Sequence, residues 1–345
     1  MTDPVPRVGI VFNAYEPRPV NTDERLSEES VAEMAVQVQG AVKALGYDPT
    51  LIPLQRSLMN FLGRIKELEL DVLVNLCEGF YGRPQWESNV AGVFELLGLT
   101  FTGSESKTLA LCQDKFKAKA VLAARGLPTP PCQLVTAAGQ APAIRLPAII
   151  KPNSEDASLG ITPDSVVRDA EAFAAQTRRI LEKYNQPALA EAFIDGREFN
   201  VAVYESESPR ALPVSELDFS AMPEGSPHIL SYEAKWFEDH LLYNASPPVC
   251  PAPIGDELRS KLQETAVAAF KAMNCRDYAR VDFRMDAKER IYILEVDPNP
   301  DISLNAGFAR AIKVSGLTYE KFWKIMLANA MKRKASHDTP DGGAR

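Results

Sequence analysis

Near the C-terminus, two runs of alternating apolar and polar residues, 279–285 and 291–297, lie on either side of a short polar segment. Successive side chains of a strand point to opposite faces, so this alternation predicts two antiparallel strands joined by a tight turn. The polar face of the first strand carries Arg280, Asp282 and Arg284. One face of the second strand carries Ile293, Glu295 and Asp297.

The predicted hairpin brings acidic side chains together. If Asp286 pairs with Ile291 across a four-residue loop, two further facing pairs follow: Asp282 with Glu295, and Arg280 with Asp297. Like charges on neighbouring strands repel, and burial makes the repulsion worse, so the three carboxylates indicate a bound divalent cation. Carboxylate oxygens of this kind suit Mg²⁺. The alternative is a solvated sheet face on which Arg280 and Arg284 pair with the acids.

Strand and helix patterns alternate in the first third of the chain. Compact apolar runs predict strands over 7–12, 47–53 and 71–76, and the intervening segments predict helices over 28–45 and 61–69. Such alternation is typical of a parallel α/β layer, whose ligand site lies beyond the carboxyl ends of the strands. We therefore expect Asn13–Tyr15 and Asn75–Glu78 to meet at one crevice.

The same patterns predict the remaining elements. An apolar strand fills 146–152, and a strand, a turn and a second strand fill 188–203. Helices are expected over 109–125, 254–273 and 318–331. The polar residues 334–345 are expected to form a disordered tail.

Composition narrows the classes of function. The 345-residue chain is 46% hydrophobic and 24% charged, which is typical of a globular protein with more than one core. A net charge of −8 argues against a nucleic-acid partner, because nucleic-acid phosphates require clustered Lys and Arg. Five cysteines without paired spacing and only three histidines argue against a disulfide framework, a zinc site and a Ser–His–Asp triad. The chain has no signal-peptide pattern and no apolar run of about 20 residues, so we expect a cytoplasmic protein without a membrane partner.

Several segments carry a resemblance to a known family. RVDF begins at Arg280, ILEVDPNPDIS begins at Ile293, and AGFARAIKVSGLTYEKF begins at Ala306. These motifs resemble the C-terminal signature of the ATP-grasp superfamily and, within it, the D-alanine–D-alanine ligase family. The segment VNLCEGFYGRPQWESNVAGVFELLGLTFTGS resembles the first domain of the same family.

The resemblance covers nearly the whole chain and implies its fold. It implies an α/β protein: an ATP-grasp fold with an N-terminal Rossmann-like parallel domain. The implied segments are an N-terminal domain over 1–110, a central ATP-grasp subdomain over 111–205, a C-terminal ATP-grasp subdomain with the magnesium site over 206–333, and the tail 334–345.

The resemblance also implies an enzyme. It would be an ATP- and Mg²⁺-dependent carboxylate–amine ligase that acts on small amino-acid or amine substrates through an acyl phosphate and releases ADP and phosphate. By the same resemblance, Asp282, Glu295 and Asp297 would hold the metal, which is two Mg²⁺ ions or, alternatively, Mn²⁺. The implied catalytic residues are Arg280, Lys235 and Glu87, and a homodimer is implied.

The nucleotide candidates follow from the same resemblance. They are Lys115, Lys151, Ser158, Glu191, Phe193, Ile194, Glu198 and Lys235. Structural alternatives exist for several candidates. A helix lysine such as Lys115 is usually exposed to solvent, Phe193 and Ile194 could be plain core residues, Glu198 could pair with Arg197, and Glu87 could be an exposed carboxylate at a helix start.

Four positions depart from the family pattern. Glu78 stands where a histidine is common, Asp156 and Ala157 replace a glycine- and serine-rich sequence, and Asp301 replaces a glycine. Two alternatives are open; the departures favour the first, and the intact Arg280, Asp282 and Glu295 argue against the second. One is a ligase of the same fold that joins other amino acids or amines, and the other is an ATP-binding protein without turnover.

Overall fold

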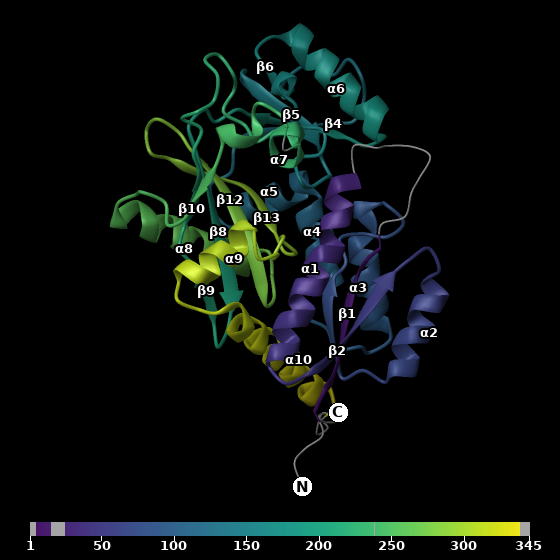
Figure 1. Ribbon diagram of the computed structural model, residues 1–345. Coiled ribbons are helices and arrows are strands. Elements are labelled where there is room, and N and C mark those ends of the chain that lie inside the picture. The colour runs from purple at the N-terminus through teal and green to yellow at the C-terminus, as the bar shows by residue number, and fades with distance from the viewer. Residues whose placement is uncertain (1–4, 15–24, 238, 339–345) are drawn as a thin grey trace, which may run out of the picture.

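The computed structural model describes residues 5–14, 25–237 and 239–338, and for 25–29 and 335–338 it describes the backbone alone. Three sheets organise this part of the chain (Figure 1). The first sheet is parallel, and the other two are antiparallel. This mixed α/β architecture agrees with the predicted fold class.

The parallel sheet has the strand order β2-β1-β3. Its elements are β1 (Arg7–Asn13), α1 (Arg25–Ala44), β2 (Asp48–Leu54), α2 (Leu58–Leu68), β3 (Val72–Leu76) and α3 (Glu87–Leu96). One face of the sheet packs on α1, and the opposite face packs on α2 and α3. The carboxyl ends of β1 and β3 meet, because Asn13 donates from Nδ2 to the Gly79 carbonyl and accepts from the Glu78 N–H, both at 2.6 Å. The predicted crevice is therefore present; Tyr15 lies outside the described residues.

The second sheet has the order β4-β7-β5-β6. Its elements are β4 (Cys132–Val135), β5 (Ala148–Pro152), β6 (Val166–Val167), α6 (Ala170–Tyr184) and β7 (Ala188–Ala192). Helix α6 covers one face through a core that includes Phe173 and Ile180. The opposite face is left to line the crevice.

The third sheet has six strands, with the path β11-β10-β8-β12-β13 and β9 paired to β8. Its elements are β8 (Arg197–Glu205), β9 (Pro209–Ala211), β10 (Ser215–Leu217), β11 (Pro248–Val249), α8 (Asp256–Ala272), β12 (Tyr278–Met285) and β13 (Ile291–Asp297). By sheet membership, the chain passes from the second sheet to the third between Ala192 and Arg197, which is earlier than the predicted boundary at 205.

The predicted helix over 109–125 is two helices. Helix α4 (Ser106–Gln113) ends at Asp114, and α5 (Lys115–Ala124) begins directly after it. Asp114 interrupts the run because its Oδ1 accepts from the Lys117 N–H at 3.1 Å, which is the hydrogen bond of an N-cap. The break places Lys115 at the first position of a helix instead of on a helix face.

The β12–β13 hairpin contains a bulge. Two predicted pairs are confirmed: Arg280 faces Asp297, and Asp282 faces Glu295. Between these pairs and the turn the register shifts by one residue, so the predicted pair of Asp286 with Ile291 is wrong. Asp286 instead closes the turn, since its Oδ1 accepts from the Lys288 and Arg290 N–H groups at 2.9 and 3.0 Å.

The bulge also changes which residues share a face. Ile293 is fully buried in the core with Val296, so the prediction that Ile293 shares the face of the acids is wrong. Leu294 and Glu295 are adjacent in sequence, yet both line the crevice. An extra residue in one strand has this effect, because it re-aims the side chains on one side of the bulge relative to the other.

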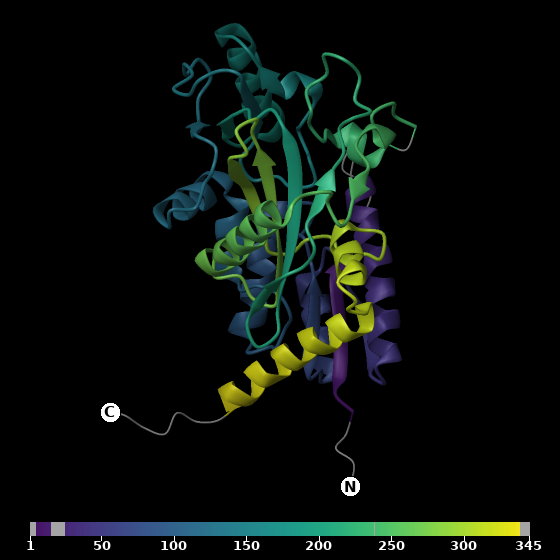
Figure 2. The same cartoon turned by 90° about the vertical axis from the view of Figure 1, so that its left-hand side faces the viewer.

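The C-terminal helices tie the parallel sheet to the third sheet. Helices α9 (Gly307–Val314) and α10 (Tyr319–Asp338) share a core with β1, β3 and α1, and α10 crosses the base of the molecule (Figure 2). The helix continues through 334–338, so this part of the predicted tail is helical; 339–345 lie outside the described residues. Lys334 contacts Asp71 at 3.0 Å, and Arg333 contacts Asp277 at 2.8 Å.

Candidate functional site

Two adjoining pockets occupy the crevice. The N-terminal pocket is lined by residues that follow β1 and β3, together with the end of β13. The inter-sheet pocket lies between β5 and β7 on one side and β8, β12 and β13 on the other. Eight residues line both: Lys115, Glu155, Asp156, Ala157, Leu159, Lys235, Arg280 and Glu295. The two pockets therefore meet at a group of opposite charges.

The structure gathers the predicted site residues in these pockets. All eight nucleotide candidates line the inter-sheet pocket, as does Asp282. Glu87 and Asp297 line the N-terminal pocket, and Arg280 and Glu295 line both. Their placement together is a finding, whereas their roles remain predictions.

Arg280 links the three acids of the hairpin. Its guanidinium donates to both carboxylate oxygens of Asp282, at 2.8 and 3.0 Å. Its Nη2 also lies 3.3 Å from Asp297 Oδ2 and 3.9 Å from Glu295 Oε1. This arginine sits among the carboxylates, as the sheet-face alternative expects.

Burial and charge act differently on the three acids. Burial raises the pKa of Asp297 to about 6, and the pull of Arg280 opposes it. Burial also raises the pKa of Asp282 against the same pull. Burial would raise the pKa of Glu295 too, but three neighbouring cations hold that pKa below its ordinary value. Glu295 is therefore the acid most firmly ionised.

The donor set can be tested for its fit to a metal. In the part of the chain that the structure describes, no three Cys, His, Asp or Glu side chains stand close enough to enclose a metal ion by themselves. The contacts of Arg280 with all three acids account for this, because its guanidinium occupies space between them. The chemistry of the donors still fits a hard divalent cation, since the hairpin face supplies carboxylate oxygens alone.

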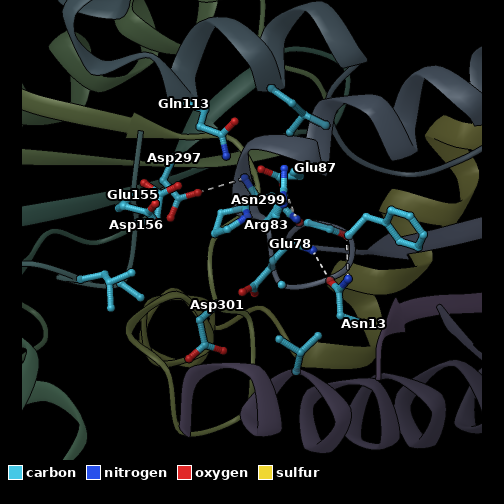
Figure 3. A pocket seen from close by; sticks show the side chains of 18 of the residues that line it. Asn13, Glu78, Arg83, Glu87, Gln113, Glu155, Asp156, Asp297, Asn299 and Asp301 are labelled. Atoms are coloured by element: carbon cyan, nitrogen blue, oxygen red, sulfur yellow. Dashed lines mark hydrogen bonds between the residues drawn. The ribbon is translucent and has the colours of Figure 1, made fainter. Parts of the chain in front are cut away.

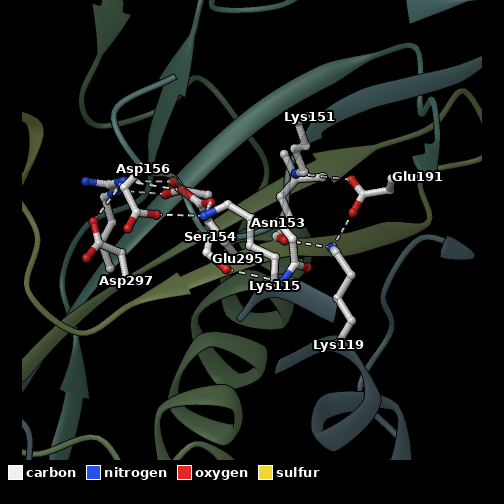
Figure 4. Close-up of polar contacts among 12 residues, drawn as sticks. Lys115, Lys119, Lys151, Asn153, Ser154, Asp156, Glu191, Glu295 and Asp297 are labelled. Carbon is white, nitrogen blue, oxygen red and sulfur yellow. Dashed lines mark hydrogen bonds and ion pairs between the residues drawn. The ribbon is translucent and has the colours of Figure 1, made fainter. Parts of the chain in front are cut away.

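Lys115 is buried at the start of α5, where the solvent-exposed alternative does not apply. Its Nζ lies 2.6 Å from Asp156 Oδ1 and 3.2 Å from Glu295 Oε2 (Figure 4). Burial alone would lower the pKa of Lys115, but the two carboxylates raise it above its ordinary value. Asp156 therefore contacts the buried lysine, although its own side chain is 49% exposed.

A buried charge cluster joins the two antiparallel sheets. Lys119 lies 2.5 Å from Glu191 Oε2, and Lys151 lies 3.7 Å from Glu191 Oε1 (Figure 4). Lys119 also donates to the carbonyls of Leu294 and Ile293, at 2.7 and 3.4 Å. Lys119 thereby connects Glu191 of β7 to the bulge that carries Glu295.

The far end of the inter-sheet pocket is built around Arg284. Glu198 contacts Arg284 Nη2 at 2.7 Å, so the predicted alternative of a pair with Arg197 does not hold; Arg197 contacts Glu216 instead. Arg284 also donates to the Gly196 carbonyl at 3.0 Å and to the His228 carbonyl. Only glycine fits at 196, because an added Cβ would lie 2.1 Å from the Met285 carbonyl oxygen.

The loop over 154–160 lies across the junction of the two pockets. Ala157 and Ser158 adopt left-handed backbone with φ of 54° and 62°, which costs energy for residues other than glycine and is common at functional sites. Trp236 of α7 (Tyr232–Trp236) donates from Nε1 to the Ala157 carbonyl at 3.1 Å. Burial lowers the pKa of the neighbouring Lys235. Ala157, Lys235 and Glu295 line both pockets.

The N-terminal pocket is rich in acids (Figure 3). Glu87 is 9% exposed and accepts from Asn299 Nδ2 at 2.8 Å, so the exposed helix-start alternative does not apply. Burial raises the pKa of Glu87 well above its ordinary value. The pKa of Glu78 is raised to about 8, mainly by burial and to a smaller extent by the nearby Asp301 and Asp297.

Sequence reasoning assigned no role in the site to Lys119 or Asn299, and it named Arg284 only as a possible partner of the hairpin acids. Lys119 follows Lys115 by one helical turn, a spacing that could have placed both lysines on the inner face of α5. Asn299 lies between two prolines, and its contact with Glu87 spans 212 positions of sequence. No local pattern predicts such a contact.

Comparisons with known proteins find relatives of this chain. Residues 122–328, more than half of the chain, match the family model described as D-ala D-ala ligase C-terminus. The chain is 30% identical over 283 residues to D-alanine–D-alanine ligase B of Chromobacterium violaceum, covering 81% of this chain and 84% of that protein. It is 29% identical over 306 residues to an uncharacterized protein, y4sG, of Sinorhizobium fredii, covering 87% and 88%.

A solved structure shows the same fold. The D-alanine–D-alanine ligase from Bacillus anthracis complexed with ATP superposes with a TM-score of 0.74 at 17% identity, covering 96% of this chain and 100% of that one. In the described residues, no helix has the length and apolar character that crossing a membrane would require.

Proposed function

Because this chain belongs to the D-alanine–D-alanine ligase family and is a ligase of the ATP-grasp fold, we propose that it joins a carboxylate to an amine at the expense of ATP, with Mg²⁺. One observation carries the proposal. The inter-sheet pocket and the N-terminal pocket meet at Lys115, Lys235, Arg280 and Glu295. A phosphoryl group bound at this junction would lie between a nucleotide on one side and an acceptor on the other.

The inter-sheet pocket would hold ATP. Glu191 and the backbone near Ile194 would meet the adenine edge, with Phe193 beside them, and Glu198 would accept from the ribose hydroxyls. Lys115, Lys151 and Lys235 would hold the phosphates under the loop that contains Ser158. The related Bacillus anthracis ligase is described as complexed with ATP, which supports this assignment.

The acids of the hairpin would hold the metal. Asp282, Glu295 and Asp297 would supply the oxygen ligands for Mg²⁺, in two ions or with Mn²⁺ as a substitute. Bound there, the metal neutralises the phosphate charge that the transfer must overcome. In the structure Arg280 shares these acids, so metal binding requires its guanidinium to release part of its contacts.

The chain's own residues then position the reacting groups. One carboxylate oxygen of the first substrate attacks the γ-phosphorus, the bond to the β-phosphate oxygen breaks, and ADP leaves. The amine of the second substrate attacks the carbonyl carbon, loses a proton, and displaces phosphate as the C–N bond forms. Arg280 would face the oxyanion that forms in this second step, and Lys235 would face the phosphate. Glu87 would lie beside the substrates.

Product analysis tests the proposal. With ATP, Mg²⁺ and a panel of D- and L-amino acids in pairs, we expect amino-acid-dependent release of ADP and phosphate. AMP and pyrophosphate as products would contradict the proposed route, because that route leaves the bond between the α- and β-phosphates intact. ATP binding without ADP release on any pair would favour the ATP-binding protein without turnover.

A further inference from the structure

Glu78 is an acid without a partner. It follows β3 at the floor of the N-terminal pocket, and only its backbone N–H is engaged, by Asn13. Its carboxylate has no hydrogen bond or ion pair within the described ranges 5–14, 25–237 and 239–338. A half-buried carboxylate without a partner is unfavourable in the ligand-free protein, so a partner supplied by a ligand would stabilise it.

Asp301 faces the same space as Glu78 (Figure 3). Asp301 is exposed. Within the described residues its carboxylate accepts a single hydrogen bond, from the Ser303 N–H at 2.9 Å. Of the charges near Glu78, Asp301 acts most strongly on it. The two carboxyl groups therefore share one part of the pocket, where a bound cation would favour the ionised form of both.

Four of the five cations that line the N-terminal pocket are engaged elsewhere, and the fifth is Lys235. Lys115 and Arg280 contact the acids at the junction of the pockets. Arg56 and Arg83 lie over the rings of Tyr81 and Trp86, at 5.2 and 4.7 Å from the ring centroids. The field of Lys235 reaches Glu78, but no ion pair joins the two.

The walls near Glu78 are aromatic. Phe80 and Tyr81 line the pocket from the loop after β3, and Tyr232 and Trp236 line it from α7. The chain's own cations already lie over two of these rings, Arg56 over Tyr81 and Lys235 over Trp236, at 5.2 and 5.3 Å from the ring centroids. Aromatic faces combined with carboxylates form a favourable environment for an organic cation, because the ring quadrupole and the negative charge act in the same direction. The same environment is unfavourable for a second carboxylate.

A buried donor indicates that the pocket is built for a ligand. Gln113 ends α4, is 8% exposed, and its amide points into the pocket (Figure 3). Its Nε2 has no hydrogen-bond partner in the described part of the chain. Buried donors in folded proteins are normally satisfied, so this group calls for an acceptor oxygen from a ligand. The acids alone would not require one.

We propose that the N-terminal pocket selects a basic amino acid. Its distal ammonium or guanidinium binds between Glu78 and Asp301, and its α-carboxylate accepts a hydrogen bond from Gln113. This inference rests on the proposed ligase activity and specifies the substrate class of that same site. Alanine has no distal charge, so it leaves the two carboxylates unpaired and is the poorer substrate.

Matched substrate pairs test the proposal. Ornithine and norleucine differ by an ammonium in place of a methyl group, and 2,4-diaminobutyrate and norvaline differ in the same way. We expect the basic member of each pair, in one enantiomer, to exceed its neutral partner at least tenfold in kcat/KM for ADP release. Glu78→Gln and Asp301→Asn should each reduce this ratio about tenfold.

Glu257→Gln is the matched control, because it removes the same charge from an exposed position at the start of α8. We expect it to leave the ratio unchanged. Circular dichroism on each variant checks folding, and Asp301→Asn, on an exposed position, serves if Glu78→Gln does not fold. Equal kcat/KM for basic and neutral partners would overturn the proposal. It would also fall if the ratio survived both substitutions, since Glu78 would then act as a neutral acid or pair with Lys235.

Calorimetry without ATP separates this inference from the proposed function. Titration of ornithine and norleucine into the intact protein and into Glu78→Gln measures selection without turnover. Ornithine binding at least tenfold tighter than norleucine, and weakened by Glu78→Gln, would support the substrate class even if no pair released ADP. ADP release from neutral pairs, combined with equal binding of ornithine and norleucine, would overturn the inference and leave the ligase activity standing.

Discussion

The two pockets differ in how their charges are matched. In the inter-sheet pocket, lysines and arginines contact carboxylates: Lys119 and Lys151 contact Glu191, and Arg284 contacts Glu198. In the N-terminal pocket, Glu78 has no such contact in the described residues. One pocket is thus held in shape before a ligand binds, and the other leaves an acid for the ligand to match.

This difference separates ATP binding, which every substrate pair requires, from the choice of substrate. A phosphate-bearing ligand requires fixed positive charge, and buried lysines keep their position only if acids hold them. A substrate pocket discriminates through the groups that a wrong ligand leaves unpaired. We therefore expect substitutions in the inter-sheet pocket to change turnover with every substrate, and substitutions at Glu78 to change the ranking of substrates.

The largest effect is expected at the junction of the pockets. Glu295→Gln keeps the shape of the side chain but removes the charge that would face the metal. We expect kcat to fall roughly a hundredfold to a thousandfold, about 3–4 kcal/mol of transition-state stabilisation. Mg²⁺-dependent ADP release measures it, and near-normal turnover would contradict the metal-site interpretation.

The melting temperature of the same variant without metal sharpens the result. From the sequence, relief of repulsion among three acids would leave stability unchanged or slightly raised. In the structure Glu295 lies 3.2 Å from Lys115, and neighbouring cations lower its pKa, so we now expect Glu295→Gln to lower the melting temperature. A raised melting temperature would show that carboxylate repulsion outweighs the contact with Lys115.

Sequence patterns predicted the elements that repeat a simple period. The alternation in β12 and β13 gave the facing pairs of Arg280 with Asp297 and of Asp282 with Glu295. The residues that the motifs selected as nucleotide candidates all line the inter-sheet pocket, although only Lys151, Glu191 and Glu198 among them lie on strands. Periodicity and local motifs thus predicted most of the helices and strands, and they selected candidates that line the inter-sheet pocket.

The bulge, the helix break and the buried ion pairs were not predicted, because they depend on contacts that the periodicity of the sequence does not encode. The bulge shifted Ile293 into the core, and Asp286 closed the turn with its own side chain. Asp114 broke a continuous helical pattern by capping the second helix. Lys119 contacts a strand 174 positions away. Long-range contacts and side-chain capping decided these features, and neither leaves a periodic signal.

The second effect in size concerns Lys119, which the motifs did not reveal. Lys119→Met keeps the length of the side chain but leaves Glu191, 1% exposed, with only the longer contact to Lys151 among the described residues. Breaking a buried ion pair in this way should cost about 3 kcal/mol of unfolding free energy. Since the ammonium also holds the bulge carbonyls, we expect the KM for ATP to rise about tenfold while kcat falls less. Denaturant unfolding and ATP titration measure the two effects.

The double variant Lys119→Met with Glu191→Gln is the control. It removes the uncompensated carboxylate, so it should regain part of the lost stability. It should not regain ATP affinity, because Glu191 is itself a candidate for the adenine edge. If the single variant unfolded within about 1 kcal/mol of the parent protein, Lys119 would not be a structural partner of Glu191.

The smallest effect is expected at the unmatched acid. The charged groups that act on Glu78 are Asp301, Asp297, Asp156 and Lys235, and burial together with the nearest acids raises its pKa to about 8. In an unfolded chain the pKa of glutamate is about 4.3. Between these two values the folded protein holds a proton that the unfolded chain has released, so stability falls as pH rises through this window.

Glu78→Gln removes this titration, because glutamine stays neutral at every pH. The melting temperature of the variant minus that of the parent protein, both without metal or nucleotide, should therefore increase steadily from pH 5 to pH 8 and level off above it. Glu257→Gln, an exposed position, should give a difference that stays flat over the same range. A flat difference for Glu78→Gln as well would mean that Glu78 ionises as an ordinary exposed glutamate. The contrast between a pocket of matched charges and a pocket with an unmatched acid would then no longer hold.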